Sequence, residues 1–125
     1  MQDLIIERTD SLPAVELKTD GNIKLEGRAL PENAFKFFQP LIAWAKEFSF
    51  DTVTININLE YFNTSVSKQL LDFLRVFEDN PANKKINIIW RYEEGDDEML
   101  ESGEIYEDLL TRCQFKYDQY EEILD

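Results

Sequence analysis

Apolar and polar residues alternate in four segments of the chain, which is the pattern of strands with one buried face. The first two segments lie at residues 15–17 and 23–25. An Asp-Gly pair at residues 20–21 suits the positive backbone angles of a tight turn, so we expect these two strands to form an antiparallel hairpin. Two longer strands are predicted at residues 53–60 and 86–92.

Apolar residues recur at helical spacing in the three intervals that follow the hairpin. Residues 31–32 open the first interval, where Pro40 is expected to kink the helix or split it in two. The second helix follows residues 63–65, and Asn80-Pro81 ends it. The third is predicted to begin at residue 96 or 97, with an acidic first turn that suits the helix dipole. The predicted buried stripes consist of Ala34, Phe38, Leu41, Ile42, Ala45 and Phe48; of Val66, Leu70, Phe73, Leu74 and Phe77; and of Met99, Gly103, Tyr106 and Leu110.

The order of these elements predicts a mixed sheet, because a helix between two strands makes a parallel crossover. Each strand has only one apolar face, so the helices are expected to pack on that face and to leave the other one open. Short strands at residues 4–7 and 115–117 are further candidates. The expected fold class is α/β, with one domain over residues 1–125 and a mixed sheet of four to five strands whose helices pack on one face.

Composition narrows the functional classes. The 125 residues include no histidine, which argues against the usual serine, cysteine and zinc hydrolases. Four glycines form no phosphate-binding loop, so we expect neither intrinsic catalysis nor a cofactor. The unpaired Cys113 favours a reducing compartment. No signal peptide or membrane-spanning segment is recognisable, and the sequence therefore predicts a cytoplasmic protein without a membrane partner.

Negative charge is concentrated in the last quarter of the chain. Residues 1–92 hold 13 acidic and 11 basic side chains, whereas residues 93–125 hold 13 acidic and 2 basic ones. Such a segment repels phosphate backbones, so nucleic-acid binding is not expected. Seven carboxylates between Glu93 and Glu104 lack the spacing of a calcium loop, and no metal site is predicted. The simplest interpretation of this acidic run is a solvated surface. If it lies at the same sheet end as Thr64, as we expect, it either helps to recognise a basic partner or makes an added phosphate repulsive there.

The most informative segment covers residues 60–68, where a predicted strand passes through two aromatic residues into a helix start rich in hydroxyl groups. One interpretation is that a residue among 63–65 only caps the helix. The other is that a hydroxyl here is phosphorylated, because a helix N-terminus offers free N–H donors and a favourable dipole. Lys68, one turn beyond Thr64, could then pair with the phosphate.

The aromatic pair Tyr61 and Phe62 also has two interpretations. One ring is expected to fill the core beneath the following helix, which is the commoner fate of a large aromatic side chain. The other is expected to be exposed beside the hydroxyl groups, as an anchor for a partner. Together with Asn63 and Lys68, these two residues make up the predicted partner-binding surface.

Three blocks of the sequence resemble one known family. They are RALPENAF at residues 28–35, LEYFNTSVSK at residues 59–68 and YEEGDDEMLESG at residues 92–103. In this order they resemble the SiaC family of bacterial regulatory phosphoproteins. More loosely, a phosphorylated residue at a helix start after a strand is similar to the STAS domains of anti-sigma-factor antagonists, and the expected fold is accordingly STAS-like.

The resemblance implies a substrate of a dedicated Ser/Thr kinase and of a PP2C-type phosphatase. The acceptor threonine of the family falls on Thr64, and Ser65 and Ser67 are second choices. Val66 stands where the family's hydroxyl-rich run leads us to expect a small polar residue. In the best understood branch, the unphosphorylated protein activates a diguanylate cyclase, which connects the switch to cyclic-di-GMP and biofilm formation.

The functional hypothesis is therefore a non-enzymatic module in which phosphorylation of Thr64 switches partner binding. Two alternatives stay open. The chain could be a constitutive acidic scaffold that is never phosphorylated. It could also be an acidic mimic that occupies a nucleic-acid-binding protein, in which case its affinity should collapse with salt.

Overall fold

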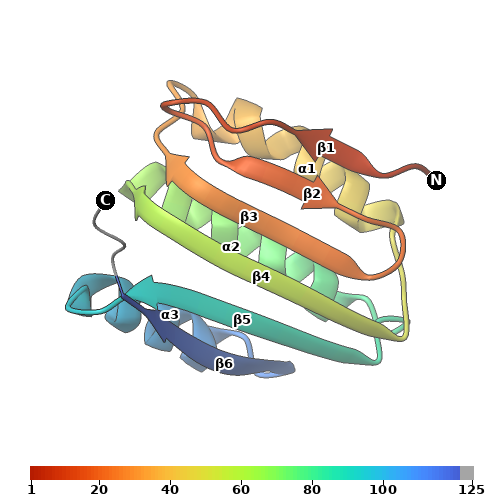
Figure 1. Ribbon diagram of the computed structural model, residues 1–125. Helices are drawn as coiled ribbons and strands as arrows, with labels where there is room; N and C mark the ends of the chain where they lie inside the picture. Colours follow the sequence, from red (N-terminus) through yellow and green to blue (C-terminus); the bar gives the residue numbers. More distant parts are fainter. Residues whose placement is uncertain (122–125) are drawn as a thin grey trace.

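The computed structural model describes residues 1–121 and contains a six-stranded sheet whose strands lie side by side in the order of the sequence (Figure 1). Three helices alternate with the later strands. The elements are β1 (Leu4–Ile6), β2 (Ala14–Leu17), β3 (Asn22–Ala29), α1 (Ala34–Glu47), β4 (Thr52–Phe62), α2 (Thr64–Asp79), β5 (Lys85–Glu93), α3 (Asp97–Leu109) and β6 (Cys113–Tyr120).

The sheet is mixed, as the sequence predicts. β1, β2 and β3 pair antiparallel, whereas β3 to β6 are all parallel and are connected through α1, α2 and α3. The strand count is six instead of four to five, because both terminal segments join the sheet. β6 is also longer than predicted, since it pairs with β5 from Cys113 opposite Ile86 to Tyr120 opposite Glu93.

The predicted hairpin connects β2 and β3. Lys18 and Asn22 close the turn through the bond from the Lys18 N–H to the Asn22 carbonyl, 3.1 Å long. Gly21 has a φ of +94°, and a Cβ there would lie 2.7 Å from the Thr52 carbonyl oxygen. Asp20 keeps a negative φ, so only the glycine of the Asp-Gly pair adopts the left-handed conformation.

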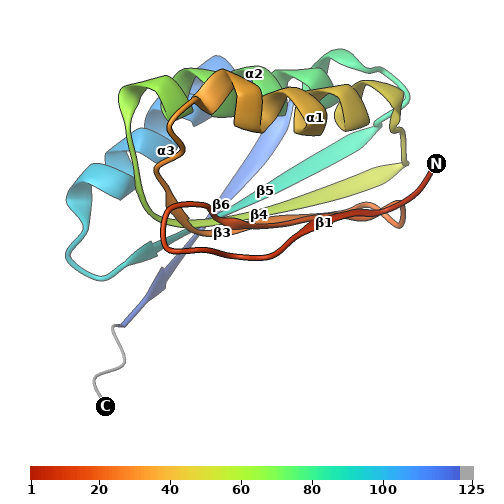
Figure 2. The same ribbon diagram turned by 90° about the horizontal axis from the view of Figure 1, so that it is seen from above.

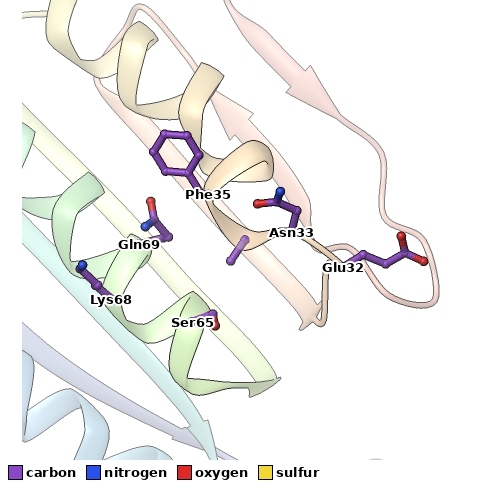
Figure 3. Close-up of a pocket in the computed structure, with 7 residues that line it drawn as sticks. Glu32, Asn33, Phe35, Ser65, Lys68 and Gln69 are labelled. Carbon is purple, nitrogen blue, oxygen red and sulfur yellow. The ribbon is translucent and has the colours of Figure 1, made fainter.

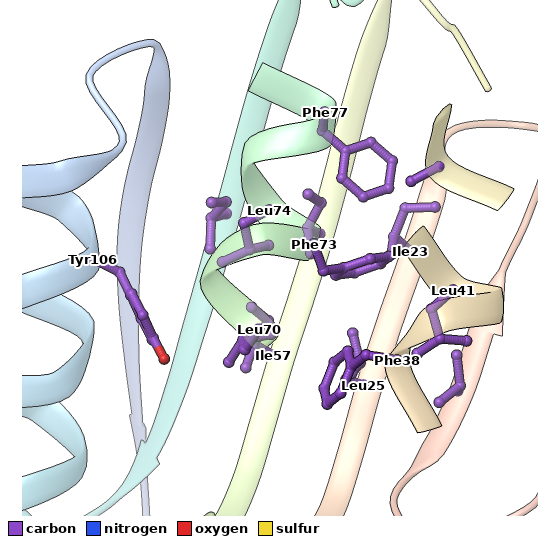
Figure 4. Packing of buried hydrophobic residues seen from close by; sticks show 14 of the residues in the cluster. Ile23, Leu25, Phe38, Leu41, Ile57, Leu70, Phe73, Leu74, Phe77 and Tyr106 are labelled. Atoms are coloured by element: carbon purple, nitrogen blue, oxygen red, sulfur yellow. The ribbon is translucent and has the colours of Figure 1, made fainter. Parts of the chain in front are cut away.

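All three helices cover the same face of the sheet and leave the other face open (Figure 2). The core lies between the two layers, where the stripes of α1 and α2 meet apolar side chains of β3 and β4 (Figure 4). Among residues 1–121, no helix is long and apolar enough to cross a membrane. Residues in the centre of this core include Ile23, Leu25, Phe38, Leu41, Ile57, Leu70, Phe73, Leu74 and Phe77.

α1 begins later than expected, and it is not split at Pro40. The helix begins at Ala34 instead of at residues 31–32, because Asn33 Oδ1 caps it by accepting the Lys36 N–H at 3.0 Å. Pro40 also does not split the helix. Proline removes the hydrogen bond to the carbonyl one turn earlier, which belongs to Lys36. Both residues are exposed, so water can solvate that carbonyl oxygen.

The parallel strands bring the starts of the helices to one end of the molecule. β3, β4 and β5 run in the same direction, and each is followed by a helix. The N-termini of α1, α2 and α3 therefore lie at the carboxyl edge of the sheet, where parallel α/β sheets commonly form binding sites. This edge contains the segment that the sequence marks as the site.

Candidate functional site

The junction of β4 and α2 determines which hydroxyl group begins the helix. β4 ends at Phe62, and Asn63 has the extended backbone of an N-cap residue, with φ −92° and ψ 178°. Its Oδ1 atom accepts the Val66 N–H at 2.9 Å, and its carbonyl oxygen accepts the Ser67 N–H at 2.9 Å. Asn63 is thus the cap, and Thr64 is the first helical residue.

The side chain of Thr64 lies on the surface at this first turn. The opening N–H groups of a helix have no acceptor within it and carry partial positive charge. The two oxygens of Asn63 accept the N–H groups of Val66 and Ser67, so the N–H groups of Thr64 and Ser65 have no acceptor within the described part of the chain. Such donors can stabilise a phosphate ester on an adjacent hydroxyl group.

The two second choices differ in their surroundings. Ser65 is exposed like Thr64, but Ser67 is half-buried, and its Oγ lies 2.8 Å from the Tyr106 hydroxyl oxygen. The Tyr106 hydroxyl also donates to the Ser67 carbonyl oxygen at 2.8 Å. Burial raises the pKa of Tyr106 to about 12, against the opposing effect of its hydrogen bond to Ser67. The geometry therefore favours Thr64 and Ser65 as acceptors over Ser67, whose hydroxyl connects α2 to α3.

Tyr61 and Phe62 differ in exposure, as predicted. Phe62 is half-buried and packs edge-on against Trp90, with ring centroids 6.5 Å apart. Tyr61 keeps 53% of its surface exposed. Tyr61 is therefore the ring of this pair that a partner can reach, and Phe62 anchors the end of β4 to the core.

A shallow groove separates the first turns of α1 and α2 (Figure 3). Phe35 lines it and is 60% exposed, which makes it a second accessible aromatic ring beside the hydroxyl cluster. Lys68 lines the same groove, is exposed and forms no ion pair within residues 1–121. The complete lining consists of Glu32, Asn33, Ala34, Phe35, Ser65, Lys68 and Gln69.

Sequence reasoning missed Phe35 as a site residue. Its signal was present, because Phe35 is a large aromatic residue one position away from Ala34 and therefore outside the buried stripe of α1. A ring at such a position has to face solvent or a neighbouring helix. The closeness of α1 to α2, which brings Phe35 toward Ser65, depends on the tertiary fold and leaves no pattern in the sequence.

The acidic run covers the end of β5 and continues into α3. It therefore lies at the same end of the sheet as Thr64, as its place after a parallel strand predicts. A second hollow joins the end of β4 to the start of α3. Glu60 pairs with the Arg8 guanidinium, and Asp96 Oδ1 caps α3 by accepting the Met99 N–H at 3.1 Å. Within residues 1–121, no three potential metal ligands come together. The hollow is lined by Glu60, Tyr61, Phe62, Asp96, Glu98, Met99 and Ser102.

Comparison with known proteins agrees with the resemblance drawn from the sequence. An uncharacterized protein of Pseudomonas aeruginosa strain UCBPP-PA14 is 27% identical over 122 residues, which cover 94% of each chain. A solved structure of the diguanylate cyclase SiaD in complex with its activator SiaC from Pseudomonas aeruginosa matches with a TM-score of 0.79 and 26% identity, over 96% of this chain and 100% of the matched one.

A structure of apo-SiaC from the same organism also matches, with a TM-score of 0.79 and 26% identity over 95% of this chain and 98% of that one. These matches confirm the mixed α/β fold. The model of the SiaC family regulatory phosphoproteins matches residues 6–120. Since this match includes nearly the whole chain, the chain belongs to the SiaC family of regulatory phosphoproteins.

Proposed function

We propose that this chain is a non-enzymatic regulatory protein whose binding to other proteins is switched by phosphorylation of Thr64. The observation that carries the proposal is the place of Thr64: an exposed hydroxyl at the first turn of α2, beside two N–H groups that have no acceptor among residues 1–121. A phosphate there gains hydrogen bonds and a favourable dipole without entering the core. The fold can therefore carry both states.

The chemistry of the switch belongs to its partners. A Ser/Thr kinase transfers the terminal phosphoryl group of ATP to Thr64 Oγ1, which releases ADP and the hydroxyl proton. A PP2C-type phosphatase hydrolyses the ester and restores the hydroxyl group with inorganic phosphate. ATP and the metal ions of this cycle are thus needed by the two enzymes, and this chain contributes the acceptor and its surroundings.

The switch acts on the surface around Thr64. In the unmodified state, this end of the sheet carries the neutral hydroxyl group of Thr64 and the exposed rings of Phe35 and Tyr61. Phosphorylation adds roughly −1.5 to −2 charges at the same end of the sheet as the hollow that Glu60 and Glu98 line beside Tyr61. A partner that buries these rings against an acidic or apolar surface is then repelled, and one with a phosphate-binding site is favoured.

A diguanylate cyclase is the proposed target of the unmodified form. The support is that the similar Pseudomonas aeruginosa protein SiaC is described as the activator of the diguanylate cyclase SiaD and forms a complex with it. Control of such an enzyme would link Thr64 to cyclic-di-GMP and to biofilm formation. It would also place the chain in the cytoplasm, with the nucleotide substrates of the cyclase and the kinase.

The test compares proteins captured by the parent, by Thr64→Ala and by Thr64→Glu from the native cell. We expect Thr64→Ala to retain the cyclase under every growth condition and Thr64→Glu to lose it. Ser65→Ala is the matched control and should behave like the parent. Identical partners for all four proteins would contradict the switch and favour a constitutive scaffold. Partners that are nucleic-acid-binding proteins released by salt would favour the mimic.

A further inference from the structure

The outer surface of α3 combines exposed aliphatic side chains with unpaired negative charge. Ile105 is 59% exposed and Leu109 is 44% exposed. They stand four residues apart, so both lie on one side of the helix. The same side continues through Ser102 and Glu98, which line the hollow beside Tyr61. We call Tyr61, Ser102, Ile105 and Leu109 the α3 stripe.

Carboxylates border this stripe on the solvent side of the helix. Six of the 13 residues of α3 are acidic and none is basic. All six are exposed, and none forms an ion pair within residues 1–121. Their charge is felt nearby, because the pKa of Tyr117 is raised first by burial and then by Glu107, Glu104 and Asp108. The acidic residues are Asp97, Glu98, Glu101, Glu104, Glu107 and Asp108.

The fold does not require the aliphatic side chains of the stripe. α3 is attached to the sheet by Met99, Gly103 and Tyr106, which are buried on its inner side. Ile105 and Leu109 lie outside this set and stay in contact with solvent. Ile105 and Leu109 thus form an exposed apolar pair, one helical turn apart, that a partner can cover.

The charge of this surface restricts its occupant. A second copy of the chain would bring two acidic helices together in a protein with a formal charge of −13. Nucleic acids and anionic membranes would be repelled in the same way. A basic amphipathic helix satisfies both features, because its apolar row can cover Ile105 and Leu109 while its lysine and arginine side chains meet the carboxylates.

We propose that the α3 stripe binds a basic amphipathic helix of a partner protein. This inference deepens the proposed function and rests on it for the presence of a protein partner. Its chemistry is nevertheless separate from Thr64, which begins a different helix. The two surfaces meet at Tyr61, so one partner can contact both.

The test uses two synthetic helical peptides of roughly 18 residues, each composed of leucine and lysine. In one, leucine recurs at positions i, i+3, i+4 and i+7; in the other, the same residues are scrambled. We expect the parent to bind the amphipathic peptide about tenfold more tightly than the scrambled one. Equal affinity for the two peptides, or binding of neither, would overturn the inference.

Two variants locate the binding. The double variant Ile105→Ser with Leu109→Ser should abolish the preference for the amphipathic peptide. The control Ile5→Ser, which changes a β1 residue that is 55% exposed, should retain this preference. The double variant Glu101→Gln with Glu104→Gln should lower the affinity for both peptides and reduce the salt dependence of binding. The control Glu7→Gln with Asp10→Asn, in the N-terminal segment, should change neither. If the α3 variants bind like their controls, the proposed surface is wrong. Thr64→Ala should bind like the parent, so the result is independent of the phosphorylation test.

Discussion

At the scale of single residues, Asn63 sets the chemistry of the site. Its side chain caps α2, and this makes Thr64 the first helical residue. A cap by Thr64 itself would use the hydroxyl oxygen as an acceptor for a backbone N–H. An amide cap leaves the Thr64 hydroxyl exposed. The asparagine and the threonine therefore act as a pair.

We predict that Asn63→Ala lowers the free energy of unfolding by about 1 kcal/mol, the usual effect of losing an N-cap. Asn63→Ser, which can cap in the same way, should recover most of this loss. Urea denaturation followed by circular dichroism measures both. Equal stability of the alanine variant and the parent would show that the bond from Val66 to Asn63 does not hold the helix start.

At the scale of elements, the attachment of α3 decides where the acidic run lies. Gly103 lets the helix backbone approach the Trp90 ring closely, because a Cβ there would be 2.7 Å from two indole atoms. The Trp90 Nε1–H also donates to the Met99 carbonyl oxygen at 2.9 Å. Trp90 is fully buried, and the rings of Phe62 and Tyr106 contact it edge-on. The indole therefore has no room to move away.

Gly103→Ala tests this contact. Alanine has the higher helix propensity by about 1 kcal/mol, but a forced overlap in a packed core costs about 1–3 kcal/mol. We predict a net loss of stability of about 1 kcal/mol, seen as a lower urea midpoint, and no loss for the neighbouring control Ser102→Ala. A Gly103→Ala protein more stable than the parent would mean that helix propensity dominates and that the approach to Trp90 is not tight.

The elements also show what the sequence can predict. β2 to β5 were predictable because each buries alternate residues under the helices. α2 was predictable because its buried stripe agrees with the residues that begin and end the helix. The split at Pro40 was wrongly expected, because local stereochemistry does not reveal that this turn of α1 faces water. The bond between Ser67 and Tyr106 joins residues 39 apart in sequence, so no local pattern contains it. The same limit applies to the groove that brings Phe35 toward Ser65.

At the scale of the whole molecule, opposite ends of the fold have different roles. The helices begin at the carboxyl edge of the sheet, where the hydroxyl groups, exposed rings and carboxylates gather. The far end is fastened by Arg112, whose guanidinium donates to the carbonyl oxygens of Glu78 in the last turn of α2 and of Asn80 and Asn83 just after it. Cys113 is buried beside this network. The proposed phosphorylation site thus lies at one end of the fold, and the hydrogen bonds of Arg112 lie at the other.

The burial of Cys113 predicts a loss of stability at alkaline pH. Burial, and next the charge of Glu78, raise the pKa of the thiol from 9.0 to about 12, while Arg112 acts in the opposite direction. The unfolded chain therefore loses this proton at lower pH than the folded one. The thiol's contribution is complete below pH 9 and is lost as pH rises toward 12, by at most about 1.4 kcal/mol per pH unit.

Urea denaturation of the parent and of Cys113→Ala between pH 8 and pH 11 measures this contribution, because the other alkaline groups are common to both proteins. The stability of the parent should fall more steeply above pH 9. Parallel curves would show that the thiol ionises as readily in the folded protein as in the unfolded chain.

The most direct test of the central claim is to map the phosphorylated residue. The protein is isolated from its native cell in the presence of phosphatase inhibitors, weighed intact and then digested for peptide sequencing by mass spectrometry. We expect one added phosphoryl group, located on Thr64 and absent from Thr64→Ala, while Ser65→Ala still acquires it. A phosphate on Ser67 or elsewhere, or an unmodified protein under every growth condition, would contradict the account.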